Sequence, residues 1–589
     1  MTNRVPSFRS FALACSGAAL LTAALAVPAL AQISVPSETI PGHFDADKAV
    51  ADRQTLAADL LAAEGKARIE GLTVMPGVEV LERLATADPN AGRLLVGESL
   101  PLESQVRFDA AANKMLIAEA RPIANGMLHK RADGFVWFTK VRSEGAKAVR
   151  LHFTDFNLPR GAEMYVYTEK EAYGPYIGKG LYGDGEFWSH IVFGSEVRVQ
   201  VRYTGDLTDR VMAGSMFEIA DVIHLGDRFF LADWMDSAQN DKAFCSFNAS
   251  CVQNRTCSSI PSAIQPAITA VAHLQFNVGS GAFICSGGLL NDTDGSTTKP
   301  YLLTANHCFS SSASASSLTS FFQFSTSCGG SCGSASGNQV NGSTLRATNA
   351  TSDFTLVELS GSLPGGSTLL GWTTSAVANS NNTSLYRISH PGGAPQAYSR
   401  HSVDTSAGTC SGIPRGAWIY SRDTFGATEG GSSGSVVLNS SGQVVGQLTG
   451  ACGTNTGNPC DSNNNATIDG ALASYFSQVE QYLDPQTGGC THSGSPGSAN
   501  YCSTSCPCDD GFGDCDNDNE CVSGTTCVSN VGPNYGWASW VDVCEGSGGG
   551  GGPNSCVGNC GGQASGGCWC DSQCASFGDC CSDKVSVCG

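Results

Sequence analysis

The sequence predicts a mainly β protein of several domains, with an all-β sandwich or a pair of β-barrels at its centre. Closely spaced turn residues separate many short apolar runs between residues 243 and 485, which is typical of such β domains. All but one of the 27 cysteines lie between Cys245 and Cys588, so this half of the chain differs in chemistry from the half before it. A length of 589 residues also exceeds that of one ordinary domain.

Residues 1–31 have the pattern of a signal peptide. Arg4 and Arg9 precede the apolar run Phe11–Val27, and Ala29-Leu30-Ala31 is a small-x-small cleavage site. A membrane anchor is the alternative, but polar residues and a proline interrupt the short run. We therefore expect a secreted, extracellular protein. The dense cysteine set agrees, because disulfides form in oxidising compartments.

Residues 32–242 contain no cysteine and form a separate predicted unit. Phe44–Glu70 is alanine-rich with helical spacing, and short alternating stretches follow it. Alternation of period two predicts half-buried strands and therefore a β-sandwich. The stretches are Phe135–Phe138, Ala148–Phe153, Met164–Tyr167 and Val197–Tyr203. Because this unit offers no pair of nucleophile and base, we interpret it as a propeptide, with a retained binding domain as the alternative.

Two small cysteine-rich modules are predicted after a Gly/Ser-rich linker, residues 485–500. Residues 490–545 and 556–589 contain eight cysteines each, and the glycine-rich linker 546–555 separates them. Units this small need disulfides in place of a large core, and in an exported chain we favour disulfides over zinc sites. Asp514–Glu520 is rich in oxygen ligands but lacks EF-hand spacing, so we favour a solvated acidic turn over a calcium site.

The net charge of −20 limits the partners that the chain can have. An acidic chain lacks the basic footprint that phosphate binding needs, which argues against a nucleic-acid partner. No later segment is long and apolar enough to span a membrane. We expect a monomer without cofactor or metal, which acts on protein or peptide substrates and whose C-terminal modules bind a protein or surface partner.

Three segments of the central part carry residues suited to acyl transfer, which needs a hydroxyl, a base to take its proton and an acid to orient that base. The segments are Leu303–Cys308, Thr351–Leu356 and Glu429–Ser435. They offer His307, Asp353 and Ser433, in the chain order of two-barrel proteases and not of subtilisins or lipases. Each segment alone has an ordinary structural explanation. All three in this order, within one disulfide-rich β domain, predict a catalytic triad.

Neighbouring residues support this prediction. Cys308 is positioned to form a disulfide with Cys285 and so to fix the loop that bears His307. Around Ser433, small residues allow a tight turn that directs the N–H groups of Gly431 and Ser433 at one point. Two such donors form an oxyanion hole, and losing one typically costs about 2.7–4 kcal/mol of transition-state stabilisation.

The three segments resemble those of the bacterial lysyl endopeptidase family within the chymotrypsin-like serine proteases. Val445–Leu448 after the serine and His390-Pro391 before it are also similar, and the likeness covers about Cys245 to Pro485. The resemblance implies a chymotrypsin-type double β-barrel, with the histidine as general base, the aspartate as its orienting partner and the serine as nucleophile. It also implies disulfides from the start of this part to later cysteines: Cys245 with Cys452 or Cys460, and Cys251 with Cys328.

The expected substrate pocket departs from the family pattern. The family's acidic pocket residue aligns with Thr467, and Thr449 stands in place of a histidine. Ala427, six residues before the serine, is expected at the pocket floor. Because a lysine ammonium buried without a carboxylate is costly, we hypothesise that strict lysine specificity is lost and that small or apolar side chains are preferred. Asp461 and Asp469 are near enough in sequence to leave an acidic pocket as the alternative.

Two further features concern maturation and the C-terminus. Ser432 stands where many relatives that are activated by a new N-terminal amine carry aspartate. We therefore expect activation by removal of the N-terminal unit, with Lys242-Ala243 as a candidate cleavage point. The cysteine plan of Cys556–Cys588 resembles the somatomedin-B-like domain. Taken together, these residues predict a secreted serine endopeptidase, and a secreted adhesion or binding protein with a non-catalytic protease fold is the alternative.

Overall fold

The structure is a computed structural model, which describes most of the chain after residue 31. The described residues are 32–65, 71–88, 92–113, 117, 122–205, 215–227, 245, 248–294, 297–330, 338–485, 497–499, 501–504, 507–508, 511–521, 525–535 and 537–546. The expected signal peptide, the Lys242-Ala243 cleavage point and the module 556–589 lie outside these ranges, as does nearly all of both linkers. Within them, no helix combines the length and the apolar character that a membrane crossing needs.

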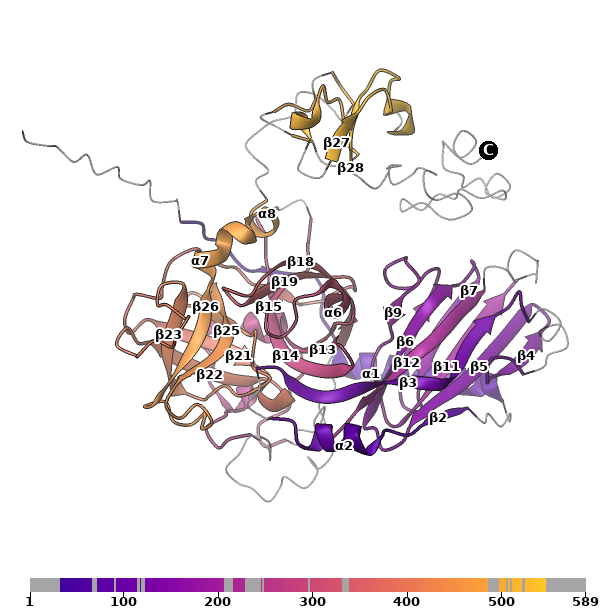
Figure 1. Ribbon diagram of the computed structural model, residues 1–589, viewed down its shortest axis with the longest axis horizontal. Coiled ribbons are helices and arrows are strands. Elements are labelled where there is room, and N and C mark those ends of the chain that lie inside the picture. Colours follow the sequence, from indigo (N-terminus) through magenta and orange to yellow (C-terminus); the bar gives the residue numbers. More distant parts are fainter. Residues whose placement is uncertain are drawn as a thin grey trace, which may run out of the picture.

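Two β-sheets packed face to face form the N-terminal unit (Figure 1). Its strands are β2 (Leu72–Val74), β3 (Leu94–Asp109), β4 (Met127–Arg131), β5 (Gly134–Ser143), β6 (Ala148–Asn157), β7 (Ala162–Tyr167), β8 (Ala172–Tyr176), β9 (Phe187–Trp188), β10 (Val192–Phe193), β11 (Glu196–Thr204) and β12 (Met216–Leu225). One sheet has the order β2-β5-β11-β7-β8 with β4 beside β5, and the other contains β10-β6-β12-β3 with β9 beside β6. A buried apolar cluster fills the space between them, which confirms the predicted β-sandwich.

Two helices accompany this sandwich, α1 (Ala46–Glu64) and α2 (Val78–Ala85). Helix α1 covers the outer face of β11, so Gln200 in that strand is buried and donates through Nε2 to the Leu60 carbonyl at 2.9 Å. The Asp45 side chain caps α1 at its start. Gly65, with a φ of +66°, ends it. The helix is therefore shorter than the alanine-rich stretch that predicted it.

Two β-barrels form the central part of the chain. The strands of the first are β13 (Val271–Val278), β14 (Gly281–Leu290), β15 (Tyr301–Ala305), β16 (Thr319–Phe322), β17 (Asn338–Asn341), β18 (Ser343–Asn349) and β19 (Phe354–Leu359). Those of the second are β21 (Ser384–Ser389), β22 (Ala397–Val403), β23 (Trp418–Phe425), β24 (Val436–Leu438), β25 (Val444–Gly453) and β26 (Asn465–Ala471). The first has the order β17-β16-β13-β14-β15-β19-β18, and the second closes as β21-β22-β23-β26-β25-β24. The chymotrypsin-type double barrel is thereby confirmed.

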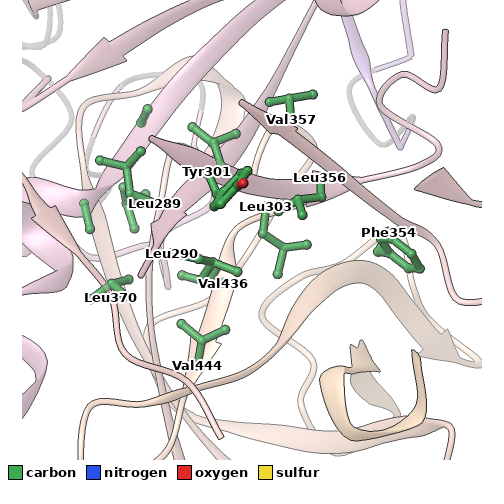
Figure 2. Packing of buried hydrophobic residues seen from close by; sticks show 14 of the residues in the cluster. Leu289, Leu290, Tyr301, Leu303, Phe354, Leu356, Val357, Leu370, Val436 and Val444 are labelled. Atoms are coloured by element: carbon green, nitrogen blue, oxygen red, sulfur yellow. The ribbon is translucent and has the colours of Figure 1, made fainter. Parts of the chain in front are cut away.

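A shared apolar core joins the two barrels. Leu289 and Leu303 of the first barrel lie in one buried cluster with Val436 and Val444 of the second (Figure 2). Short helices border the barrels, and the last two end this part of the chain. These helices are α5 (Ala267–Ala270), α6 (Ser312–Ser316), α7 (Leu472–Tyr475) and α8 (Glu480–Leu483). Burying each large apolar side chain contributes about 1.5–3 kcal/mol, so this core fixes how the barrels meet.

The N-terminal unit is continuous with the first barrel. Strand β3 pairs antiparallel with β14, so a single 12-stranded sheet runs from the sandwich into the barrel. Arg150 of β6 is fully buried at this junction, where it donates to Gln275 Oε1 at 3.0 Å. A second contact is the antiparallel pairing of β1 (Glu38–Thr39) with β20 (Thr368–Leu369). The two units therefore share a large interface in the full chain.

Disulfides tie the central part of the chain together in a pattern that the sequence predicted only in part. The Cys285–Cys308 bond is present as predicted. The two other predictions were wrong, because Cys251 bonds Cys460, and Cys452 bonds Cys410, which leaves neither later cysteine for Cys245. Cys328 bonds Cys257 instead. The reason is that the segment before Cys257 lies beside the loop that leads to Cys328, where the Thr256 hydroxyl donates to the Thr326 carbonyl at 2.8 Å.

The described part of the first C-terminal module is a small disulfide-bonded unit around β27 (Thr525–Val528) and β28 (Val543–Gly546). Its bonds are Cys502–Cys508, Cys515–Cys527 and Cys521–Cys544. These sulfurs are therefore unavailable to zinc. In the acidic turn, the Glu520 carboxylate accepts from the Asp516 N–H at 2.8 Å, and Asp518 Oδ1 accepts from the Cys527 N–H at 2.9 Å. These bonds hold the turn together.

Candidate active site

The histidine and aspartate singled out in the sequence lie together at the junction of the barrels. His307 follows β15, and Asp353 directly precedes β19, which pairs with β15. Nδ1 of His307 lies 2.7 Å from Oδ2 of Asp353, and Oδ1 of Asp353 accepts from the His307 backbone N–H at 2.8 Å. Asp353 is only 6% exposed, so water competes little for its oxygens. The two bonds fix the ring and direct its Nε2 away from the carboxylate.

The backbone at Asp353 is held in an uncommon conformation. Its φ of +52° lies in the left-handed region, which aspartate tolerates better than most residues. The Asn306 N–H and Gln447 Nε2 both donate to the Asp353 carbonyl at 3.1 Å, and the Tyr475 hydroxyl donates to Gln447 Oε1. Such strain costs about 1–3 kcal/mol and persists where the surroundings over-determine it. The surrounding hydrogen bonds thus set the position of the carboxylate.

Ser433 lies in the turn between β23 and β24, against the loop that bears the histidine. Its carbonyl accepts from the Ser286 N–H at 2.8 Å, and Sγ of Cys308 lies 3.8 Å from the same oxygen. Ser433 is 5% exposed. Nε2 of His307 is buried and makes no hydrogen bond to any described residue. The structure thus joins His307 and Asp353 by a hydrogen bond and places Ser433 against the loop that bears His307.

The turn before Ser433 presents two backbone N–H groups. The Gly430 carbonyl accepts from the Gly392 N–H at 2.6 Å, and across a trans peptide this directs the Gly431 N–H the opposite way. Gly431 has a φ of +93°, where an added Cβ would also meet a backbone oxygen at 2.9 Å. Its carbonyl accepts from Ser286 Oγ at 2.9 Å. Among the described residues, none accepts a hydrogen bond from the N–H of Gly431 or of Ser433.

A cavity opens beside Ser433 in the second barrel, with walls from the turn before the serine and from β23, β25 and β26. Thr449 and Thr467 line it as expected. Ala427 does not, because it is buried in an apolar cluster that includes Ala397. The Thr449 hydroxyl is buried and has no hydrogen-bond partner among the described residues, so it is available to a ligand.

An acid that the sequence reasoning missed also lines this cavity. Asp423 lies on β23, opposite His401 of β22, and its side chain is 13% exposed. Its Oδ1 accepts from Thr467 Oγ1 at 2.9 Å and lies 2.7 Å from His401 Nδ1. These partners orient the carboxylate, which lies in the wall of the cavity next to Thr467.

The two acids that we considered from sequence proximity lie elsewhere. Asp469 is fully buried in an ion pair with Arg387, which also donates to the Ser435 carbonyl at 2.8 Å. Asp461 lies in an exposed loop, where its carboxylate accepts from Asn455 and Asn464 at 2.7 Å. Neither lines the cavity. The acids that do line it are Asp423 of β23 and Glu429 of the turn before Ser433.

The comparisons with known proteins agree with this geometry. Residues 240–469 match the family model described as "Lysyl endopeptidase, C-terminal domain". The central part of the chain is therefore similar to the C-terminal domain of lysyl endopeptidases. The chain is 26% identical over 355 residues to the lysyl endopeptidase of Pseudomonas aeruginosa, covering 57% of this chain and 72% of that protein.

Solved protease structures are similar to part of the chain. The HtrA-type protease AlgW with tripeptide is 17% identical, with a TM-score of 0.27, and the alignment covers 38% of this chain and 64% of that one. The active form of the Rv3671c protease from M. tuberculosis is 13% identical, with a TM-score of 0.26, and covers 42% of this chain and 94% of that one. At such low TM-scores, the fold of the protease domain rests on its own strand topology.

Removing the Cys285–Cys308 disulfide is expected to lower the free energy of unfolding by about 3 kcal/mol. The bond closes a loop of 23 residues, whose closure limits the freedom of the unfolded chain. Denaturant titration of the double variant Cys285→Ala/Cys308→Ala against the parent checks this. An unchanged midpoint would mean that the bond adds no constraint.

The protease domain is also expected to lose stability as the pH falls from about 6.5 towards 4. Burial lowers the pKa of His390 to about 4, whereas an unfolded histidine titrates near 6.5. Between these values the unfolded state binds more protons, so the free energy of unfolding falls by about 3 kcal/mol from this one residue. Unfolding measured at pH 7 and pH 4.5 should show a smaller loss in His390→Gln than in the parent. An equal loss in both would assign the effect to other groups.

Proposed function

We propose that the protein is a serine endopeptidase in which Ser433 is the nucleophile, His307 the general base and Asp353 its orienting partner. The 2.7 Å contact between Nδ1 of His307 and Asp353 carries this proposal, because it leaves Nε2 to act as the proton acceptor. This nitrogen makes no hydrogen bond to any described residue and is therefore open to the Ser433 hydroxyl. Catalytic hydrogen bonds often tighten only in the substrate complex.

The reaction would proceed in two halves. Nε2 of His307 takes the proton from Ser433 Oγ as this oxygen attacks the peptide carbonyl, and the same proton passes to the leaving amine. The acyl-enzyme is then hydrolysed by water, from which His307 again takes a proton. The N–H groups of Gly431 and Ser433 would bind the oxyanion in both halves. Because the Gly430 carbonyl is already bonded to Gly392, these donors need no rearrangement during the reaction.

We further propose that the enzyme cleaves after lysine or arginine. The cavity next to Ser433 is lined by the carboxylate of Asp423 and by the unpartnered hydroxyl of Thr449, which suit the charge and the N–H donors of a basic side chain. The name of the Pseudomonas aeruginosa relative agrees with a lysine preference. We therefore favour a basic substrate residue over the small or apolar side chains that Thr467 first indicated.

Labelling with an organophosphonate tests the proposed nucleophile. An active serine protease forms a covalent adduct with such a reagent, because the oxyanion hole and the base activate only one hydroxyl. Peptide mapping of the processed enzyme should find the adduct on Ser433. A protein with a non-catalytic protease fold would take no label, and an adduct on another serine would assign the nucleophile elsewhere.

Secretion and processing complete the proposal. The signal-peptide pattern of residues 1–31 and the disulfides at Cys285, Cys410 and Cys502 fit an extracellular enzyme. We propose that the N-terminal unit is a propeptide that is removed on maturation. N-terminal sequencing of the secreted material would identify the cleavage point, and an N-terminus near residue 32 in the active enzyme would instead make the unit a retained domain.

A further inference from the structure

The first residues of strand β3 lie at the edge of the substrate cleft, by which we mean the surface beside His307 and Ser433 into which the cavity opens. Leu94 and Leu95 of β3 pair with Ile284 and Phe283 of β14, in an antiparallel register that continues to Gly97 and Ala282. The residue after Ile284 in β14 is Cys285, whose disulfide partner Cys308 directly follows His307. The start of β3 therefore reaches the first-barrel side of the cleft, opposite the second-barrel cavity. A substrate with one side chain in that cavity would extend over this same edge.

Gly92 contacts the proposed general base. A Cβ on Gly92 would lie 2.7 Å from Cδ2 and 3.1 Å from Nε2 of His307, so the backbone here lies directly against the imidazole. Gly92 also lines the cavity that contains Ser433 and Asp423. Any larger residue at this position would have to displace the segment or the ring. The close approach explains why glycine stands here.

Arg93 anchors the segment to the loop that bears the imidazole. Its Nη1 donates to the carbonyls of His307 and Cys308 at 3.4 and 3.3 Å. Its guanidinium also lies 4.8 Å from the ring centroid of Phe283 on β14. A cation over an aromatic ring contributes about 0.5–1 kcal/mol at partly exposed sites. These contacts are made only while the N-terminal unit occupies the cleft.

The catalytic turn is already arranged for the reaction while this segment is bound. The Gly430 carbonyl is held by Gly392, as described above, and the Ser432 hydroxyl accepts from the Ser389 hydroxyl at 3.2 Å and from the Glu429 N–H at 3.3 Å. The Ser432 hydroxyl is therefore paired without the new N-terminal amine that serves activation in relatives with aspartate at this position. A block on activity in the full chain would therefore come from occupation of the cleft and not from a distorted oxyanion turn.

We propose that Gly92–Val96 is a built-in competitor for substrate, a strand that occupies the leaving-group side of the cleft until the N-terminal unit is removed. This inference rests on the proposed protease function. The segment adds to the β14 edge through backbone pairing, as an extended substrate would. At the cleavage centre it offers Gly92, which has no side chain for the cavity that Asp423 lines. In this register the strand therefore binds with no basic side chain in the cavity, and the bond after Gly92 is a poor site for cleavage.

The rate of organophosphonate labelling in the full-length chain tests the proposal. The parent chain should react at least 10-fold more slowly than the processed enzyme, and Arg93→Ala should recover much of the difference. Arg107→Ala is the matched control, because Arg107 lies further along β3 and pairs with Asp155 and Glu218 away from the cleft. Equal rates in the parent chain and the processed enzyme would overturn the inference. No label in either form would instead reject the proposed function, so the two failures are distinguishable.

A synthetic peptide with the sequence of residues 92–97 gives a second measurement that does not depend on folding of a variant. It should inhibit the processed enzyme competitively in initial-rate measurements, before cleavage after Arg93 can remove it. The same peptide with Gly92→Val should inhibit at least 10-fold more weakly, because its side chain collides with His307. Equal inhibition by both peptides, or none by either, would show that the segment does not compete through this contact.

Discussion

Replacing Ser433 with alanine is expected to lower kcat/KM for peptide hydrolysis on the order of 10⁶-fold without unfolding the protein. The hydroxyl is the only group that we assign to attack, and removing one member of a cooperating triad typically costs nearly as much as removing all three. The residual rate would come from the oxyanion donors Gly431 and Ser433, whose backbone the substitution leaves in place. A chromogenic peptide assay on the processed protein measures the loss.

Ser441→Ala is the matched control for this experiment. Ser441 lies in the exposed turn between β24 and β25, so its loss removes a hydroxyl of the same kind without touching the cleft. Its activity should stay within twofold of the parent. If Ser433→Ala retained more than about a hundredth of the parent activity, the nucleophile would have to be another residue.

The sequence predicted those parts of the site that depend on local segments. His307, Asp353 and Ser433 each stand in a short stretch with its own composition, and Cys285 lies close enough in the chain to pair with Cys308. The structure adds the hydrogen bonds that position them. Some of these bonds join residues more than 90 positions apart, such as Gln447 and Asp353, and no local pattern could indicate them.

Asp423 shows why the pocket could not be predicted in the same way. Its position in the cavity depends on the register between β22 and β23, which places Asp423 opposite His401, and on Thr467 from a third strand. A shift of one residue would turn the carboxylate to the other face of the sheet. The linear sequence therefore directed attention to Asp469, which lies closer to the expected position but pairs with Arg387 inside the barrel.

Because this register places the Asp423 carboxylate in the cavity, we expect Asp423→Asn to have a large effect that is selective for basic substrates. We expect kcat/KM for substrates with lysine at the cleaved bond to fall on the order of 10²- to 10³-fold, because leaving a desolvated cation without its partner typically costs about 2–5 kcal/mol. Cleavage after small apolar residues should change much less. The substitution is nearly isosteric, and the asparagine oxygen can still accept the bond from Thr467 at the position where Oδ1 now lies.

A matched control distinguishes the loss of the pocket charge from a general effect of removing an acid from this barrel. Asp461→Asn removes an acid from the same barrel at a site that does not line the cavity, so its lysine preference should equal that of the parent. A peptide library with all residues at the cleaved position measures the ratio of lysine to alanine for each variant. If Asp423→Asn kept the parent's ratio, or if the parent preferred alanine, the carboxylate would have no part in recognition. The other groups that line the cavity, Glu429 and the small side chains of Thr449 and Thr467, would then set the specificity of the pocket.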